Sequence, residues 1–148
     1  MSPIASKARE LFARQIECIE QDDRAAQLEL YAPDVVYEFP FANDRPRRIE
    51  GRDAFRRMME PLWTAARARS VKVKCAHTNL IDGADPTVLV AEFALDSVVG
   101  GSSVTLEFVQ VLRIRDDKIV HLREYFSPSA RAEIEVEPER SRSSATRQ

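Results

Sequence analysis

The chain of 148 residues contains little of what marks several large classes of protein. It has 2 cysteines, Cys18 and Cys75, and no cysteine and histidine set at the spacing of metal ligands. We therefore expect two reduced core thiols and no metal site. A glycine-rich phosphate loop and a Ser-His-Asp arrangement are also missing, so nothing in the sequence predicts a bound cofactor.

The sequence also lacks an excess of charge of one sign. Its 22 basic and 24 acidic side chains give a formal net charge of −2. Such a chain has no long-range field to attract phosphate backbones or anionic lipid, so neither nucleic acid nor membrane is an expected partner. The first residues, MSPIASKARELF, contain no long apolar run. We therefore expect neither a secretory signal nor a membrane span, and a cytoplasmic location.

The first half of the chain has helical periodicity. Apolar residues spaced by three and four predict an amphipathic helix over residues 4–19 and a short second helix over residues 24–31. A third helix is predicted over residues 53–68, where Pro61 should kink or split it.

Strand patterns surround and follow this last helix. Residues 35–39 are rich in β-branched and aromatic side chains and stop at Pro40, which predicts a short edge strand. Beyond Ser70 the period changes to two, and hairpin-length turns separate four predicted strands, at residues 71–81, 87–98, 104–115 and 118–126. Helices followed by an antiparallel meander predict an α+β domain over residues 1–128, and the charged residues 129–148 should form a disordered tail.

Two stretches of sequence resemble a known family. The segment YAPDVVYEFP at residues 31–40, with IEGRDA at residues 49–54, is similar to the early helix, strand and helix start of nuclear transport factor 2-like domains. The segment RIRDDKIVHLREYF at residues 113–126 resembles their last hairpin. Within that superfamily the combination is most similar to SnoaL-like, phenazine-biosynthesis A/B-like and limonene-epoxide-hydrolase-like proteins. The resemblance implies a cone-shaped, curved antiparallel sheet of cystatin-like topology wrapped around N-terminal helices.

The same resemblance implies a pocket for acid/base chemistry on a hydrophobic small molecule of secondary metabolism, without a cofactor. Polyketide cyclisation in antibiotic biosynthesis, isomerisation and hydrolysis are the reactions of such pockets. A cyclase, isomerase or hydrolase is therefore our leading interpretation. Because fold does not fix function, a non-catalytic, small-molecule-binding or accessory dimeric protein remains the alternative.

Compared residue by residue, the resemblance narrows the choice of catalytic mechanism. Where ketosteroid isomerases carry a helix tyrosine, a base and a strand acid, this chain has Gln15, Phe39 and Gln110, so their mechanism is not expected here. Where limonene-epoxide hydrolases carry two acids and an orienting arginine, the arginine is missing and two glutamates, Glu92 and Glu124, remain.

Glu124 is the leading catalytic candidate. It should share a strand face with Val120, Leu122 and Phe126 and thus point into an apolar pocket. There desolvation would raise the pKa of the carboxyl group toward neutrality and let it shuttle a proton. The alternative is an ion pair across strands of the sheet, with an arginine such as Arg113 or Arg123.

Two further catalytic candidates are weaker. Glu92, in line with Val88 and Val90, is either a second pocket acid or one half of an ion pair. If both glutamates faced one cavity, their repulsion would keep one of them protonated. His77, on a strand face with Val73 and Cys75, could orient a substrate or a water, although a lone histidine is more often structural.

The remaining candidates concern binding. Gln15 and Gln110 could hydrogen-bond a ligand carbonyl, although a glutamine more often satisfies a backbone group. The candidate walls for a ring-shaped ligand are Tyr37, Phe39, Trp63, Phe108 and Tyr125, although aromatic residues at these spacings are above all ordinary core. The run Arg45, Arg47, Arg48 and Arg52 either receives a carboxylate-bearing substrate or forms a solvated loop. Alternating apolar residues on the outer sheet face, such as Val109 and Val111, predict a homodimer through the sheet.

Overall fold

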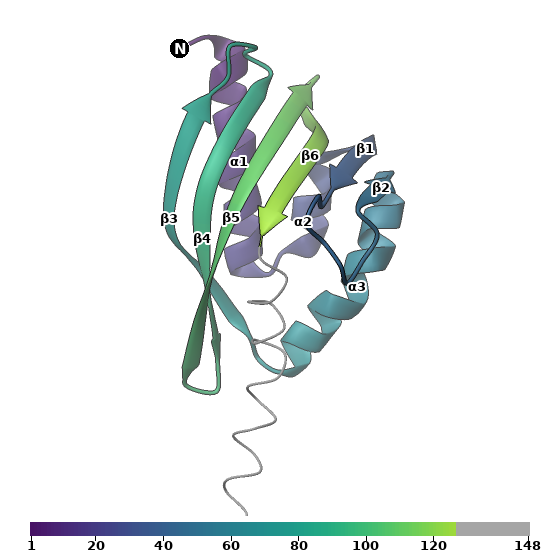
Figure 1. The fold of residues 1–148 in the computed structure, drawn as a ribbon, viewed down its shortest axis with the longest axis vertical. Helices are drawn as coiled ribbons and strands as arrows, with labels where there is room; N and C mark the ends of the chain where they lie inside the picture. The colour runs from purple at the N-terminus through teal and green to yellow at the C-terminus, as the bar shows by residue number, and fades with distance from the viewer. Residues whose placement is uncertain (127–148) are drawn as a thin grey trace, which may run out of the picture.

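The computed structural model describes residues 1–126, which form three helices and a six-stranded sheet (Figure 1). In chain order the elements are α1 (Pro3–Gln21), α2 (Arg24–Glu29), β1 (Tyr31–Glu38), β2 (Arg48–Glu50), α3 (Arg52–Ala68), β3 (Lys72–Asp82), β4 (Val88–Val99), β5 (Ser102–Arg115) and β6 (Lys118–Phe126). The strand order is β2-β1-β6-β5-β4-β3. The predicted α+β architecture, with N-terminal helices on one face of a curved sheet, is confirmed. The predicted tail at residues 129–148 lies outside the described residues.

The first strand differs from its prediction in extent and in place. β1 begins at Tyr31, so the second helix ends at Glu29 and does not reach residue 31. The predicted edge position is wrong, because β2 covers one side of β1 and β6 pairs with the other in parallel. The pairing with β6 is irregular between Tyr31 and Val36, and Pro33 lies in that stretch, where its missing N–H interrupts no regular ladder.

Helix α3 runs without a break past Pro61, against the prediction of a split. Proline removes one helical hydrogen bond and crowds the preceding turn. Phe55 and Trp63 nevertheless bury the same helix face on either side of it, so packing against the rest of the domain sustains the helix.

The core lies between the helices and the concave face of the sheet. α1 lies against β3, β4 and β5, and α3 lies against β1 and β2. The Phe12 ring meets Phe93 edge-on at 5.3 Å, and Phe93 stacks on Phe108 at 5.1 Å. Helix and sheet thus join through aromatic contacts in the centre and diverge toward α3, where the cavity described below opens.

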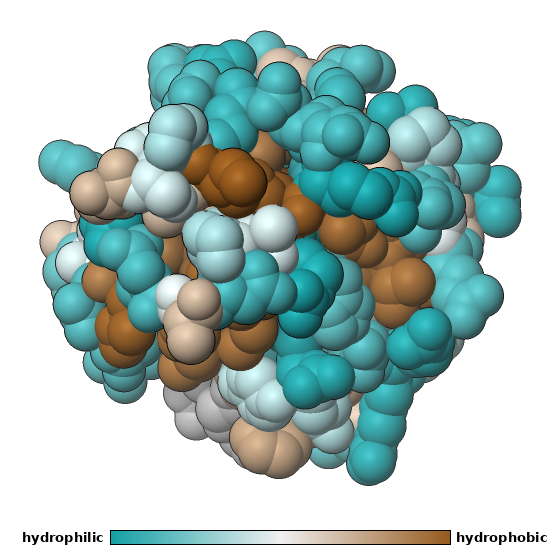
Figure 2. All heavy atoms as spheres, turned by 90° about the horizontal axis from the view of Figure 1, so that it is seen from above, coloured by the Kyte–Doolittle hydropathy of each residue, from teal (hydrophilic) through white to brown (hydrophobic). Residues whose placement is uncertain are grey.

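The end of the molecule seen in Figure 2 carries hydrophobic side chains in separate patches between hydrophilic ones. None of the helices among residues 1–126 has the length and apolar character needed to cross a membrane. The homodimer expected from the outer sheet face stays a prediction.

Candidate active site

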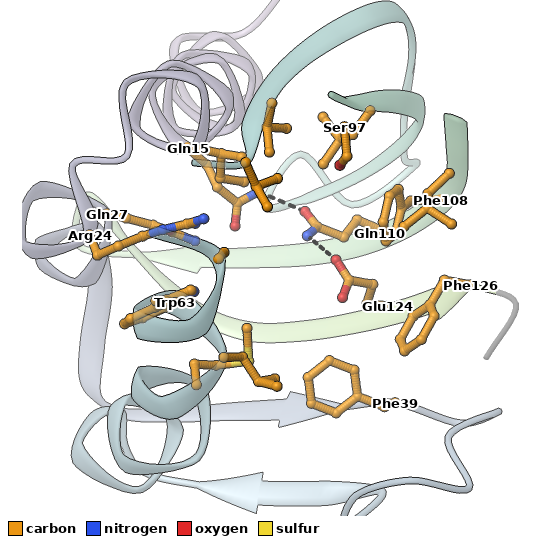
Figure 3. A pocket seen from close by; sticks show the side chains of 18 of the residues that line it. Gln15, Arg24, Gln27, Phe39, Trp63, Ser97, Phe108, Gln110, Glu124 and Phe126 are labelled. Carbon is orange, nitrogen blue, oxygen red and sulfur yellow. Dashed lines mark hydrogen bonds between the residues drawn. The ribbon is translucent and has the colours of Figure 1, made fainter. Parts of the chain in front are cut away.

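A cavity of about 440 Å³ lies between the concave sheet face and the helices. Its wall is mostly apolar and aromatic, and Gln15, Gln110 and Glu124 form a hydrogen-bonded series across it (Figure 3). Inward side chains of β1 and of β3 to β6 form the sheet side, and side chains of α1, α2 and α3 form the other. The polar residues that line it are Gln15, Arg24, Gln27, Tyr37, Arg45, Arg69, Ser97, Gln110 and Glu124.

Glu124 lies on the cavity wall, where the strand pattern predicts it. On β6 it shares the inward face with buried Leu122 and with Phe126. In the sheet register it stands directly opposite Gln110 of β5, whose Nε2 donates a hydrogen bond of 2.9 Å to Glu124 Oε1. The Phe39 and Phe126 rings lie beside it (Figure 3). Both arginines that the sequence offered as ion-pair partners lie near other carboxylates, since Arg113 pairs with Asp85 and Arg123 lies 3.7 Å from Glu38.

Gln15 and Gln110 are almost completely buried and bonded to each other. Gln15 Nε2 donates to Gln110 Oε1 at 2.8 Å, across the gap between α1 and the sheet (Figure 3). The Gln110 amide also lies 3.5 Å from the Tyr37 hydroxyl. The resemblance placed these two glutamines where ketosteroid isomerases carry a tyrosine and an acid, and both do line the cavity.

The chain of hydrogen bonds continues away from the sheet. The Tyr31 hydroxyl donates to Gln15 Oε1 at 2.8 Å and accepts from Gln27 Nε2 at 3.0 Å. Gln27 Oε1 in turn accepts from Arg24 Nη1 at 2.9 Å, and the Arg24 guanidinium lies over the Trp63 ring. An arginine and a carboxylate therefore stand at the two ends of one buried relay.

The direction of this relay is fixed by its ends. A guanidinium can only donate and an ionised carboxylate can only accept, so each amide between Arg24 and Glu124 must accept on one side and donate on the other. Every N–H and O–H in the series then points toward Glu124. Aligned donors polarise one another, so the series strengthens the hydrogen bond that Glu124 accepts from Gln110.

Two tyrosines beside the relay keep their protons. Burial is the main cause that raises the pKa of Tyr37 well above its usual range, and the nearby Glu124 charge raises it further. The pKa of Tyr31 is also raised, again chiefly by burial. At neutral pH, Tyr37 therefore presents a hydroxyl donor next to Glu124, on the cavity wall.

The structure does not bring Glu92 to the cavity. On β4 the inward residues are odd-numbered, and Phe93 and Leu95 line the cavity. Glu92 points to the exposed outer face, where its Oε1 accepts a hydrogen bond of 2.8 Å from Asn79. The expectation of a second pocket acid is wrong because an amide on the neighbouring strand satisfies this carboxylate in solvent.

His77 and Tyr125 also lie outside the cavity. The β3 register shifts between Cys75, which pairs with inward Leu95, and His77, which pairs with outward Ala94. This bulge reverses the alternation, so His77 is exposed although Cys75 faces inward. Tyr125 follows Glu124 on β6 and points outward, with its ring 5.3 Å from Phe41.

The aromatic wall otherwise agrees with the sequence. Tyr37, Phe39, Trp63 and Phe108 all line the cavity. Three arginines line it as well, namely Arg24, Arg45 and Arg69. Of these, the sequence singled out only Arg45, as one of four arginines near a polar loop. Arg24 and Arg69 begin or follow helices, and no periodic signal marks a charged residue that reaches back over a pocket.

Comparison with known proteins gives a family match over most of the chain. The family model of the SnoaL-like domain matches residues 12–122. An uncharacterized PhzA/B-like protein of Pseudomonas aeruginosa is 29% identical over 126 residues, which cover 82% of this chain and 84% of that protein.

Solved structures share the fold. A candidate isomerase from Bacillus subtilis superposes with a TM-score of 0.75 at 25% identity, over 87% of this chain and 92% of that one. An epoxide hydrolase of the limonene-epoxide-hydrolase-like kind from M. tuberculosis gives a TM-score of 0.62 at 20% identity, over 82% and 84%. The architecture is therefore the nuclear transport factor 2-like one that the sequence resemblance implies.

Proposed function

Because this chain belongs to the family of SnoaL-like domains, we propose that it is an acid/base enzyme acting on a hydrophobic carbonyl compound. Glu124 serves as its proton shuttle. The reaction class is isomerisation or cyclisation, in which a proton leaves a carbon next to a carbonyl group.

One observation carries the proposal: the Glu124 carboxylate at the end of a polarised hydrogen-bond relay, in a cavity whose wall is mostly apolar. A carboxylate exposed to water is a weak base, because water molecules occupy its hydrogen-bonding positions in place of the substrate. In a small, mostly apolar space, the same group is aimed at the substrate and held in one position by Gln110. Geometry of this kind, with few convergent polar groups, is typical of sites for general acid–base catalysis.

The residues present can accept and return the proton that moves in the proposed step. The Glu124 carboxylate takes a proton from the α-carbon, and the electron pair of that C–H bond moves into an enolate. The Tyr37 hydroxyl, which keeps its proton, donates to the developing oxygen charge. In an isomerisation of an unsaturated ketone, Glu124 then returns the proton to a different carbon of the conjugated enolate. In a cyclisation, the enolate carbon attacks an internal carbonyl carbon, and Glu124 passes its proton to the alkoxide oxygen that forms.

Hydrolysis has less support from the site. If two carboxyl groups activated a water, a second acidic side chain would have to lie on the cavity wall. Glu92, the candidate for this role, lies on the outer face. Among residues 1–126, the acidic side chain on the cavity wall is Glu124. A single base that takes and returns one proton therefore fits the site better than a base paired with a separate acid.

The test is exchange of α-hydrogen for deuterium, which needs no knowledge of the natural substrate. 2-Tetralone, a two-ring ketone, is incubated with the protein in D₂O, and loss of the α-proton signal is followed by NMR. We expect the wild type to accelerate exchange over buffer, and Glu124→Gln to lose roughly 10²- to 10⁴-fold of that acceleration, because an amide cannot accept the proton.

Glu92→Gln is the matched control, since it makes the same change on the outer face and should exchange as fast as the wild type. The melting temperature of each variant shows whether folding is retained. Equal exchange by Glu124→Gln and wild type would remove Glu124 from the mechanism.

The second candidate function is ligand binding without catalysis, and one observation favours it. Gln15 and Gln110 use both their amide nitrogens and their carbonyl oxygens on protein partners, so neither is free to polarise a substrate carbonyl. This candidate predicts that 2-tetralone binds to the cavity while the wild type gives no exchange above buffer.

A further inference from the structure

Arg45 is a buried cation on the wall of the cavity. It lies in the loop between β1 and β2, and its side chain is only 6% exposed. The guanidinium lies over the rings of Phe39 and Phe126, 5.2 and 5.4 Å from their centres. Both rings also line the cavity. Burial of a charged group in aromatic surroundings is unfavourable unless partners compensate it.

Asp44 compensates one edge of the guanidinium. Arg45 Nε donates to Asp44 Oδ1 at 3.0 Å, and Nη2 donates to Oδ2 at 2.8 Å. This two-point contact fixes the plane of the group and leaves Nη1 on the opposite side. Arg45 Nη1 is buried and has no hydrogen-bond partner among the described residues.

The other described polar groups of the wall do not share this property. Arg24 gives its Nε to Asp22 and its Nη1 to Gln27, and the two buried glutamines bond each other. An unsatisfied N–H pair on a rigidly held guanidinium is therefore the feature of this wall that calls for an acceptor from outside the chain.

We propose that Arg45 binds the carboxylate of the substrate, so that this protein acts on an aromatic or alicyclic acid. An ionised carboxylate matches the free donor in charge and geometry, and the dry site strengthens the hydrogen bond between them. The inference rests on the proposed function in taking the cavity as the substrate site, and it adds the substrate class.

The spacing of the site sets the shape of that substrate. Phe126, which lies under Arg45, is two residues beyond Glu124 on the same face of β6, a separation of about 7 Å along the strand. The anion and the proton-transfer carbon therefore lie on opposite sides of a ring-sized group. Rings of Phe39 and Phe126 flank the space between them. Placing the substrate's negative charge away from Glu124 also limits repulsion between the two carboxylates.

The test compares two probes that differ in charge and hardly in shape, 2-naphthoate and 2-naphthamide. Binding to the full chain is measured by calorimetry at neutral pH, without turnover. We expect wild type to bind the naphthoate more tightly. In Arg45→Met the naphthoate should weaken roughly 10- to 100-fold, while the amide changes little, because the lost interaction is a charge-assisted hydrogen bond.

Arg113→Met is the matched control, since it removes one positive charge from the outer face, where Arg113 pairs with Asp85. It should leave both affinities unchanged. Arg45→Lys covers the case in which Arg45→Met does not fold: it keeps the charge without the fork and should still prefer the acid to the amide.

Three results would overturn the proposal: naphthoate binding to wild type no more tightly than the amide, equal losses for both probes in Arg45→Met, or a loss in Arg113→Met as large as in Arg45→Met. Glu124→Gln separates this inference from the proposed function. That variant should still bind naphthoate through Arg45 although it no longer exchanges α-protons. The binding result therefore tests the role of Arg45 even if the wild type shows no catalysis.

Discussion

Two glutamates on neighbouring strands of the same sheet have opposite surroundings. Glu38, at the end of β1, faces outward and lies beside three basic side chains: His121 Nε2 lies 2.6 Å from its Oε1, and Arg48 and Arg123 lie within 4 Å. Glu124, on β6, faces inward and is held by an amide in an aromatic cavity.

The two sites differ in what they can do with a proton. Cations around Glu38 hold the pKa of its carboxyl below the usual range, with the His121 hydrogen bond as the largest cause. Glu38 is thus stabilised as a carboxylate, and it does not line the cavity. Glu124 accepts a hydrogen bond from the neutral Gln110 amide and lines the cavity in which we propose that the substrate binds. Since Arg123 and Glu124 are adjacent in sequence, the alternation of one strand separates an ion-pair face from a chemical face.

The largest effect expected on stability comes from breaking the inner relay. Gln110→Leu leaves the buried Gln15 amide without its acceptor and removes the Gln110 donor from half-buried Glu124, and it should lower the free energy of unfolding by about 2–4 kcal/mol. Urea denaturation measures this. Gln21→Leu, at the exposed end of α1, is the control and should stay within about 0.5 kcal/mol of wild type. A Gln110→Leu protein as stable as wild type would mean that apolar packing replaces the relay at no cost.

A smaller effect is expected at the outer glutamate, and it depends on pH. A carboxyl whose pKa is lowered by folding stabilises the protein above its unfolded pKa of about 4.5, and this contribution is lost as the pH falls through the folded value. Glu38→Gln should therefore lower the melting temperature near neutral pH and converge with wild type in acid. Solvent screens the pair, so the difference should stay below about 1 kcal/mol.

Melting curves from about pH 7 down to pH 3 test this, with Glu92→Gln as a control whose carboxylate has an amide partner instead of cations. A gap between Glu38→Gln and wild type that widens on acidification would contradict the assignment of Glu38 as the stabilised carboxylate.

The smallest expected effect is the absence of a change. Since burial raises the pKa of both Tyr31 and Tyr37, neither should ionise near pH 10 while the protein is folded. Tyr37→Phe should therefore leave the absorbance titration at 295 nm unchanged up to the onset of alkaline unfolding. Loss of one tyrosine's amplitude near pH 10 would show that the hydroxyl beside Glu124 is open to solvent.

Much of the fold was predictable because local periodicity encodes it. The four long strands of the meander and the first and third helices follow from spacings of two, three and four, and packing preserves these periods. The errors arose where tertiary contacts override local signals. Tyr31 has a helical neighbourhood in sequence but pairs with Ile119 in β6, and β1 became internal because the short β2 covers it.

The candidate site was predictable to the same extent. Glu124, Gln15 and Gln110 line the cavity as expected, since regular strand and helix periods place them. His77 was misplaced because one bulged residue in β3 reverses the face of all that follow, and a bulge leaves no mark in composition. Glu92 was misplaced because the sequence pattern of an acid among valines is the same for a strand face that lines the cavity and for one that faces solvent.

By itself, the sequence determined the order of helices and strands, the inward face of β6 and the position of Glu124 on it, because these depend on periods of a few residues. Only the tertiary structure decided that Gln15 of α1 meets Gln110 of β5, and that Arg45 lies over Phe126 with one nitrogen unsatisfied. Those contacts join residues 80 and more positions apart, and their distances depend on how the layers pack, which no local pattern encodes.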